Sequence, residues 1–449
     1  MERELDPSIV EYFPDHSGHK CGYCKQKTSS FSHGMWAHTM SVEDYQDLID
    51  RGWRRSGCYC YKPIMKKTCC PQYTIRCLAT EFKLNHSHKK ILKKVNKFLT
   101  KGLIKGELQQ REPCKQQPEE QGGFVDTKVA LKLDKKDAVV EHIFDVCGNP
   151  KPPQKKAKLK RLEQRELKLA GKDIVLQKKP KSIVKSLEDF LGEKSGDACV
   201  HHLEVKMVKP GSKEFQSTFT ESYKLYVKYQ VTVHHDKEEK CTEEQYERFL
   251  VNSPLEFRQL DHGPPMGYGS FHQQYWLDNQ LIAVAVIDIL PKCLSSVYFY
   301  YDPDYSYLSL GTYGSLREMA LVRELSQYCP ELCWYYLGFY IHSCPKMRYK
   351  GQYNPSYLLC PEAFTWIPIG SCIPKLDQSK YSRLEEDNNV VDTDRIVDLS
   401  TVGVLYKRQA MTFSIYRRLK QHHVDEEKVK EYASLVGMKC ARRILLYRS

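Results

Sequence analysis

The cysteines near the N-terminus constrain the fold of this chain more than any other feature. Seven of the 18 cysteines lie in the first 77 residues: Cys21, Cys24, Cys58, Cys60, Cys69, Cys70 and Cys77. The chain starts without a basic segment followed by an apolar stretch, and no uncharged apolar run reaches about 18 residues, so we expect a soluble, intracellular protein with no membrane partner. In a reducing compartment, clustered cysteines are candidates for metal ligation or redox chemistry rather than for disulfides.

Two cysteine pairs have the spacing of a four-ligand site. Cys21 and Cys24 flank two residues in CGYC, and the adjacent Cys69 and Cys70 precede Pro71. Four thiolates suit zinc or an iron-sulfur cluster, and the residue types do not distinguish the two. Adjacent cysteines diverge in direction, so an irregular backbone near the proline is needed. Buried free thiols remain an alternative. A second alternative draws one ligand from four neighbours: Cys58, Cys60, His33 or His38.

Composition divides the chain into three predicted parts. Residues 1–105 form a Cys-rich domain with a helix over 41–52, short strands within 58–82 and a basic amphipathic helix over 86–102. Residues 106–200 are rich in Lys, Glu and Gln and poor in aromatics, which predicts a charged flexible linker or insertion. Its segment PPQKKAKLKR is typical of a nuclear-import or RNA-contacting patch, and equally of a solvated tether.

Residues 201–449 have the pattern of an α/β domain. Alternation predicts strands over 202–211 and 223–234, and LIAVAVIDIL suits a strand covered on both faces. A second strand then precedes the helix GSLREMALVRELSQY and the strand CWYYLGFYI, which implies one parallel, right-handed crossover. The predicted class is therefore mixed, α+β or α/β.

A glycine-containing turn is predicted before that helix. Gly311 to Ser315 would let backbone N–H groups approach an anion at the helix N-terminus, as in a phosphate site. The turn lacks the Lys-Ser/Thr ending of a nucleotide P-loop and the Arg/Gln-x-x-Gly-x-Gly/Ala run that binds the pyrophosphate of coenzyme A. We therefore expect no coenzyme A. A tight packing turn is the alternative.

A row of cations follows the strand CWYYLGFYI. On an extended segment Lys346, Arg348 and Lys350 would share one face and bind a carboxylate or a nucleic-acid backbone. A solvated strand edge explains the pattern equally well. The formal net charge of +13 favours a polyanionic partner and also fits a solvated basic surface.

Several long motifs together resemble the eukaryotic arginyl-tRNA–protein transferase family. They are CGYC, GWRRSG, CCPQYTIR and SHKKILKKVNKFL near the N-terminus, and GSFHQQYWLDNQLIAVAVIDILP, VYFYYDPDY, LSLGTYGSLRE, YLGFYI, CPKMRYKGQYNPSYLL and FTWIP after residue 200. The resemblance implies a GNAT-like acyltransferase domain that uses aminoacyl-tRNA in place of coenzyme A. It also implies transfer of arginine to proteins that begin with Asp, Glu or oxidised Cys, which marks them for ubiquitin-dependent degradation.

The resemblance implies site residues as well. Its acidic-residue pocket matches Arg76, His272, Lys346 and either Arg348 or Lys350 here, although a surface salt bridge explains Arg76 alone and a core position explains His272 alone. For the donor it implies a group of residues around the predicted turn: Tyr301, Asp302, Gly311, Thr312, Tyr313, Gly314 and Ser315. In this set we expect Gly311 to Ser315 to seat the 3' phosphate or the terminal adenosine, and the two tyrosines to stack on that base. Asp302 is the candidate partner of the donor arginine, unless it only braces the turn, and the basic stretch Lys89 to Lys94 is expected to track the acceptor stem.

Some questions stay open at this level. The family pattern is expected to carry Ser-Ile or Ser-Ala at Gly314-Ser315, so the seating of the tRNA end is uncertain. No general base or oligomeric state is predicted, and cytoplasmic and nuclear locations are expected. Two competing functions are a zinc-containing nucleic-acid-binding protein and a coenzyme A-dependent acetyltransferase.

Overall fold

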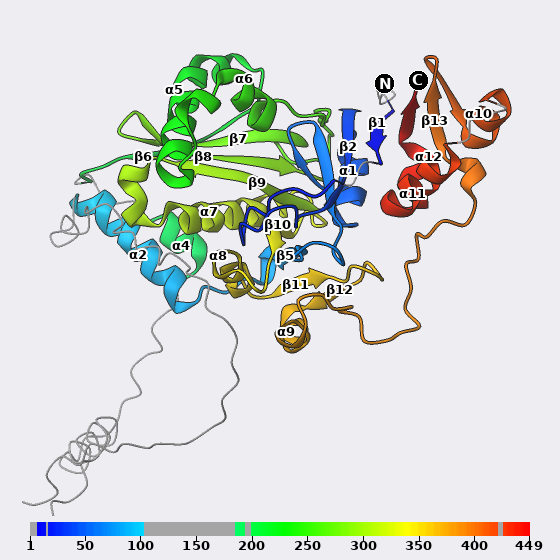
Figure 1. The fold of residues 1–449 in the computed structure, drawn as a ribbon. Coiled ribbons are helices and arrows are strands. Elements are labelled where there is room, and N and C mark those ends of the chain that lie inside the picture. Colours follow the sequence, from blue (N-terminus) through cyan, green and yellow to red (C-terminus); the bar gives the residue numbers. More distant parts are fainter. Residues whose placement is uncertain (1–6, 15–16, 103–184, 194–198, 421–424) are drawn as a thin grey trace, which may run out of the picture. The chain divides into compact units, whose positions relative to one another are not determined.

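The computed structural model describes residues 7–14, 17–102, 185–193, 199–420 and 425–449 (Figure 1). The chain divides into two compact units, and of the second, Gln109–Lys185, only Lys185 is among the described residues. The first unit, Met1–Leu108 with Ser186–Ser449, holds two mixed β-sheets and their helices. The mixed α/β class is confirmed.

The seven-stranded sheet joins both ends of the chain. Its order is β14-β13-β15-β1-β2-β4-β3, and β1 and β15 pair in parallel. The bounds of its strands are β1 Ile9–Phe13, β2 Ser32–Thr39, β3 Arg54–Ser56, β4 Tyr59–Pro63, β13 Gly403–Tyr406, β14 Gln409–Thr412 and β15 Leu445–Arg448.

The eight-stranded sheet also combines early and late segments. Its order is β12-β11-β5-β10-β9-β8-β7-β6, so β5 from the Cys-rich region lies between β10 and β11. The strand bounds are β5 Tyr73–Leu78, β6 Leu203–Val208, β7 Gly269–Leu277, β8 Gln280–Ile289, β9 Cys293–Tyr301, β10 Trp334–Tyr340, β11 Ser356–Leu359 and β12 Trp366–Pro368. The predicted parts 1–105 and 201–449 thus share both sheets.

Helices cover both faces of the eight-stranded sheet. In Figure 1, α5 (Lys213–Tyr229) and α7 (Leu310–Leu325) lie on opposite sides of β8 and β9. Val284 and Val286 of β8 pack with α5, whereas Ala285 and Ile287 belong to the core cluster that contains the apolar side chains of α7. The other α-helices that the structure describes are α1 Val42–Ile49, α2 His86–Lys101, α4 Leu187–Leu191, α6 Glu243–Tyr246, α8 Pro345–Arg348, α9 Ile369–Gln378, α10 Phe413–Lys420, α11 Glu426–Val436 and α12 Met438–Arg443.

Several local predictions are confirmed. Ser41 caps α1 by accepting a hydrogen bond from the backbone N–H of Asp44, and α2 is the predicted basic helix. The strand β8 is buried from Leu281 to Ile289, as expected for a strand covered on both faces. The strands β9 and β10, which precede and follow α7 in the sequence, pair in parallel, as the predicted crossover requires.

Two segments that were predicted to be extended are helical instead. Residues 223–234 are helical, in α5 and its continuation Gln230–His234, because Phe215, Ser222, Leu225 and Tyr226 form a buried stripe at helical spacing. The cation row is also helical: Pro345 starts α8, and a 3-10 turn follows over Tyr349–Gln352. Its three cations therefore do not share one face of an extended segment.

The domain division itself stays a prediction, because most of 106–200, including PPQKKAKLKR, lies outside the described residues. Among the helices that the structure describes, none is long and apolar enough to span a bilayer.

Candidate active site

A cavity of about 850 Å³ opens beside the parallel strands β9 and β10. These strands pair only from Trp334 to Tyr336 of β10. Beyond Tyr336 the register of β10 against its other neighbour, β5, shifts. Gly338 lies at this shift and takes φ +70°, a conformation that favours glycine. Side chains of β3, β4, β9, β10 and α7 line the resulting space, so the irregularity in β10 creates room inside an otherwise packed sheet.

Two cations flank this irregularity and line the cavity. The buried Arg54 of β3 donates to the carbonyl oxygens of Trp53 and, at 3.4 Å, Gly338. The ammonium of Lys350 donates to the carbonyl oxygens of Leu337 at 2.7 Å and Phe339 at 3.1 Å. Burial lowers the pKa of Arg54 and lowers that of Lys350 to about 7. Neither forms an ion pair with any residue that the structure describes.

The neighbouring Arg55 has a different environment. Its guanidinium makes a bidentate contact with Asp288 of β8, at 2.8 Å from Nε and 2.5 Å from Nη2, and also donates to Ser270. Both partners are buried. The attraction of Asp288 outweighs the burial of Arg55 and raises the pKa of the guanidinium. The charge of Arg55 is therefore neutralised within the protein.

One face of α7 forms another part of the cavity wall. Gly311, Ser315 and Glu318 line the cavity at positions i, i+4 and i+7. A Cβ at Gly311 would meet nothing within 4 Å, so the backbone of the first helical turn is open. A Cβ at Gly314 would lie 2.4 Å from the ring of Phe299, so this glycine allows α7 to pack on β9.

Glu318 is a buried acid with neutral partners. Glu318 is 1% exposed, and the hydroxyl of Tyr335 donates a hydrogen bond to its Oε2 at 2.8 Å. Burial raises the pKa of Glu318 to about 7, against the opposing effect of the hydroxyls of Tyr335 and Ser296. It forms no ion pair within the described part of the chain.

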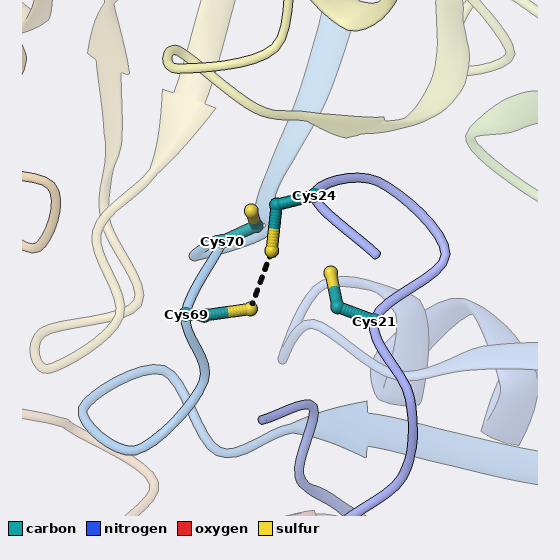
Figure 2. Close-up of side chains that lie close together, drawn as sticks. All are labelled: Cys21, Cys24, Cys69 and Cys70. Carbon is teal, nitrogen blue, oxygen red and sulfur yellow. Dashed lines mark hydrogen bonds between the residues drawn. The ribbon is translucent and has the colours of Figure 1, made fainter. Parts of the chain in front are cut away.

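The predicted cysteine site is assembled. The Sγ atoms of Cys21, Cys24, Cys69 and Cys70 all lie within 4.8 Å of one another, and Figure 2 shows the side chains converging from two loops. The Sγ atoms of Cys24 and Cys69 are 3.3 Å apart. A tetrahedral ion with metal–sulfur bonds of about 2.3 Å separates its sulfurs by about 3.8 Å, so the donor set fits a metal.

Among the described residues, the four-cysteine group does not include any of the alternative ligands, which were Cys58, Cys60, His33 and His38. Without a bound metal, burial raises the pKa of Cys70 to about 12, so metal binding at neutral pH releases a proton. Tyr23, between the first two cysteines, lines the cavity. The cysteine loop therefore contributes directly to the cavity wall.

The structure brings one of the predicted acceptor residues, Lys350, to the cavity. Arg76 is sandwiched between the rings of Trp334 and Trp366, at 3.6 and 4.0 Å from their centroids. His272 is fully buried in β7, and its Nε2 lies 3.0 Å from the carbonyl oxygen of Leu250.

Lys346 and Arg348, also predicted for the acceptor, are exposed on α8, and neither lines the cavity. The guanidinium of Arg348 donates to the carbonyl oxygen of His342. These two cations therefore lie on the surface and outside the cavity that Arg54 and Lys350 line.

The predicted donor residues also separate. Tyr301, Gly311 and Ser315 line the cavity. Tyr313 is buried, and its hydroxyl accepts a hydrogen bond from Arg317 at 3.0 Å. Thr312 lies in the first turn of α7, and the predicted turn Gly311–Ser315 is helical from its start.

Asp302 has its own partners away from the cavity. It lies 2.6 Å from the ammonium of Lys228 and accepts a hydrogen bond from the N–H of Asp304. This is the bracing role that the sequence analysis gave as its alternative.

Sequence reasoning missed Arg54 and Glu318. Arg54 lies in the motif GWRRSG, and Glu318 follows Gly311 by seven residues, which is two turns along one helix face. Both signals are weak alone. What distinguishes Arg54 and Glu318 is that neither has an ion-pair partner among the described residues, and only the tertiary structure shows this.

Comparisons with known proteins match the two stretches of sequence that line the cavity. A family described as arginine-tRNA-protein transferase, N terminus, matches residues 19–90, and its C-terminus counterpart matches 221–360. Arginyl-tRNA–protein transferase 1 of Drosophila melanogaster is 42% identical over 98% of this chain and 99% of its own length. Arginyl-tRNA–protein transferase 2 of Arabidopsis thaliana is 35% identical over 82% of this chain and 76% of its own length. Aspartate/glutamate leucyltransferase of Stutzerimonas stutzeri is 36% identical over 37% of this chain and 60% of its own length.

Proposed function

The chain belongs to the arginyl-tRNA–protein transferase family, and we propose that its cavity transfers arginine from arginyl-tRNA to the α-amine of proteins with acidic N-terminal residues. The observation that carries this proposal is the pair of cations without a carboxylate partner, Arg54 and Lys350. Cations held together at a cavity wall favour an anionic ligand.

The acidic side chain of the acceptor is the anion that fits. Its carboxylate would accept hydrogen bonds from Arg54 and Lys350 and would raise the lowered pKa of the lysine. An amide of the same shape would leave both cations unpaired, which selects Asp and Glu against Asn and Gln. The bacterial relative's name, which specifies aspartate and glutamate, supports this choice.

The donor ester would lie at the start of α7. The open backbone at Gly311 is placed to approach the terminal nucleotide or the ester oxygen, and Tyr301 offers an aromatic face to the base. In the reaction the amine nitrogen bonds to the ester carbonyl carbon, the C–O bond breaks, and one proton moves from the amine to the ribose oxygen. Because the ester is already activated, the protein contributes mainly by holding the two reactants together in a partly closed space.

This geometry also supports the GNAT-like assignment as part of the proposal. Parallel strands β9 and β10 lie on either side of α7 in sequence, and the cavity opens where their pairing ends. The tRNA end would take the position at the helix N-terminus that coenzyme A takes in acetyltransferases.

Transfer of labelled arginine tests the proposal. Purified protein should label peptides that begin with Asp or Glu, should label the Asn peptide at a much lower rate, and should not label an N-acetylated Asp peptide, which has no free amine. Labelling of the Asn and Asp peptides at equal rates would contradict the assigned acceptor, and no labelling of any peptide would contradict the transferase function.

For the cysteine site we propose a single tetrahedral ion such as zinc. The sulfurs are as close together as one ion requires. In a 4Fe–4S cluster each thiolate binds a separate iron, and in a 2Fe–2S cluster the four thiolates are divided between two irons, so sulfurs on different irons are farther apart. The ion would fix the loop that carries Tyr23 at the cavity. Anaerobically purified protein should contain about one zinc per chain and no acid-labile sulfide, and Cys21→Ser with Cys24→Ser should release the metal. Iron with stoichiometric sulfide would contradict this assignment.

The role in degradation, the oxidised-Cys acceptors and the cytoplasmic and nuclear locations stay predictions of the family resemblance. Comparing the half-life of a reporter that begins with Asp in cells with and without this protein tests the first of them.

A further inference from the structure

Arginine as the donor requires a counter-charge for its guanidinium, and the predicted partner Asp302 is already engaged by Lys228. Within the described chain, Glu318 is the one carboxylate that lines the cavity. It comes from α7, whereas the two unpaired cations come from β3 and from the turn after α8. The cavity therefore offers opposite charges on different elements, as a cationic donor and an anionic acceptor together require.

The carboxyl group of Glu318 has no charged partner among the described residues. A buried carboxylate is unfavourable unless it is paired or strongly hydrogen-bonded, and the hydroxyl of Tyr335 is a neutral donor. Arg317, the adjacent residue, directs its Nε to the hydroxyl of Tyr313 instead. A ligand cation would supply the missing charge.

The cavity that Glu318 lines suits a guanidinium in particular. Aromatic side chains supply much of its surface, among them Tyr335, which contacts Glu318, and Phe299, which packs against α7 one turn earlier at Gly314. A planar guanidinium stacks on such rings while it donates two parallel hydrogen bonds to a carboxylate, whereas an ammonium makes neither contact as well.

We propose that Glu318 binds the guanidinium of the donor arginine and thereby selects arginine among aminoacyl-tRNAs. This inference rests on the proposed function, because it takes arginyl-tRNA as the donor. Tyr335 is a positioning residue, whose hydroxyl donates to the carboxylate of Glu318.

Citrulline provides the decisive comparison, because it has the shape of arginine without the charge. Two stable donors can be prepared on tRNA with a terminal 3'-amino group, one carrying arginine and one carrying citrulline in amide linkage. The unmodified protein should bind the arginyl form more tightly, by roughly tenfold or more, as expected for a buried charged hydrogen bond.

Glu318→Gln should remove this preference by weakening arginyl-tRNA binding while leaving citrullinyl-tRNA binding unchanged. Retained binding of the citrullinyl form also shows that the variant is folded. The matched control is Glu324→Gln, an exposed position on the same helix, which should keep the full preference.

A Glu318→Gln protein that keeps the arginine preference overturns the inference. If that protein also loses transfer, Glu318 acts on the acceptor amine instead. These outcomes are distinct from failure of the proposed function, in which the unmodified protein itself transfers no arginine to the Asp peptide.

Discussion

Arg54 and Arg55 are adjacent in β3 and buried to the same extent, yet their surroundings differ. Arg55 is fixed by a bidentate contact with Asp288, whereas Arg54 meets only backbone carbonyls and the ring faces of Tyr336 and Phe339. The same residue type thus serves the fold at one position and is available to a ligand at the next. Whether a buried charge is paired distinguishes a structural role from a binding role in this molecule.

Breaking the paired member should have the largest effect. Asp288→Asn leaves Arg55 buried without its counter-charge, which costs about 3–5 kcal/mol in the free energy of unfolding. Urea or thermal unfolding of the variant measures this loss. A stability equal to that of the unmodified protein would mean that Arg55 finds other partners, and would weaken the comparison.

Removing the unpaired carboxylate of Glu318 should instead increase the free energy of unfolding. The pKa of Glu318 is raised from its usual 4.5 to about 7, so the unfolded chain ionises at a lower pH than the folded chain. This destabilises the fold increasingly as pH rises from about 4.5 to 7, and fully above 7. At about 1.36 kcal/mol per pKa unit, Glu318→Gln should therefore stabilise the protein by about 3 kcal/mol at most.

Thermal unfolding at pH 8 and at pH 5 checks this prediction. The melting temperature of Glu318→Gln should exceed that of the unmodified protein at pH 8, and the difference should shrink at pH 5. A destabilised variant at pH 8 would show that the carboxylate is needed by the fold rather than by a ligand.

A smaller effect is expected at the hydroxyl of Tyr335. Tyr335→Phe removes one hydrogen bond to Glu318 at constant shape and should weaken arginyl-tRNA binding, by about 1 kcal/mol or roughly fivefold. Citrullinyl-tRNA binding is the internal control. An equal loss for both donors would indicate a general packing defect instead of a positioning role.

Much of this site could be predicted from the sequence where the signal is local. Cys21, Cys24, Cys69 and Cys70 were identified by spacing alone, and LIAVAVIDIL by its unbroken apolar pattern. The segment 223–234 was assigned wrongly because its alternating apolar residues fit a strand as well as a helix.

Longer-range features were not accessible in this way. The position of β5 between β10 and β11 follows from contacts across more than 250 residues of chain. Arg54 and Glu318 resemble many other charged residues in the sequence, and only their lack of ion-pair partners among the described residues distinguishes them. Lys350 was predicted to share one face of an extended segment with Lys346 and Arg348, whereas its ammonium turns inward and donates to the carbonyl oxygens on either side of Gly338.

The central claim is that Arg54 and Lys350 bind the acidic side chain of the acceptor. Its most direct test is kcat/KM for Asp and Asn peptides in Arg54→Gln and Lys350→Gln, with the surface variant Arg348→Gln as the matched control. We predict a loss of roughly 10- to 100-fold for the Asp peptide in each cavity variant, little change for the Asn peptide, and no change in the control. An equal loss for both peptides would contradict the claim.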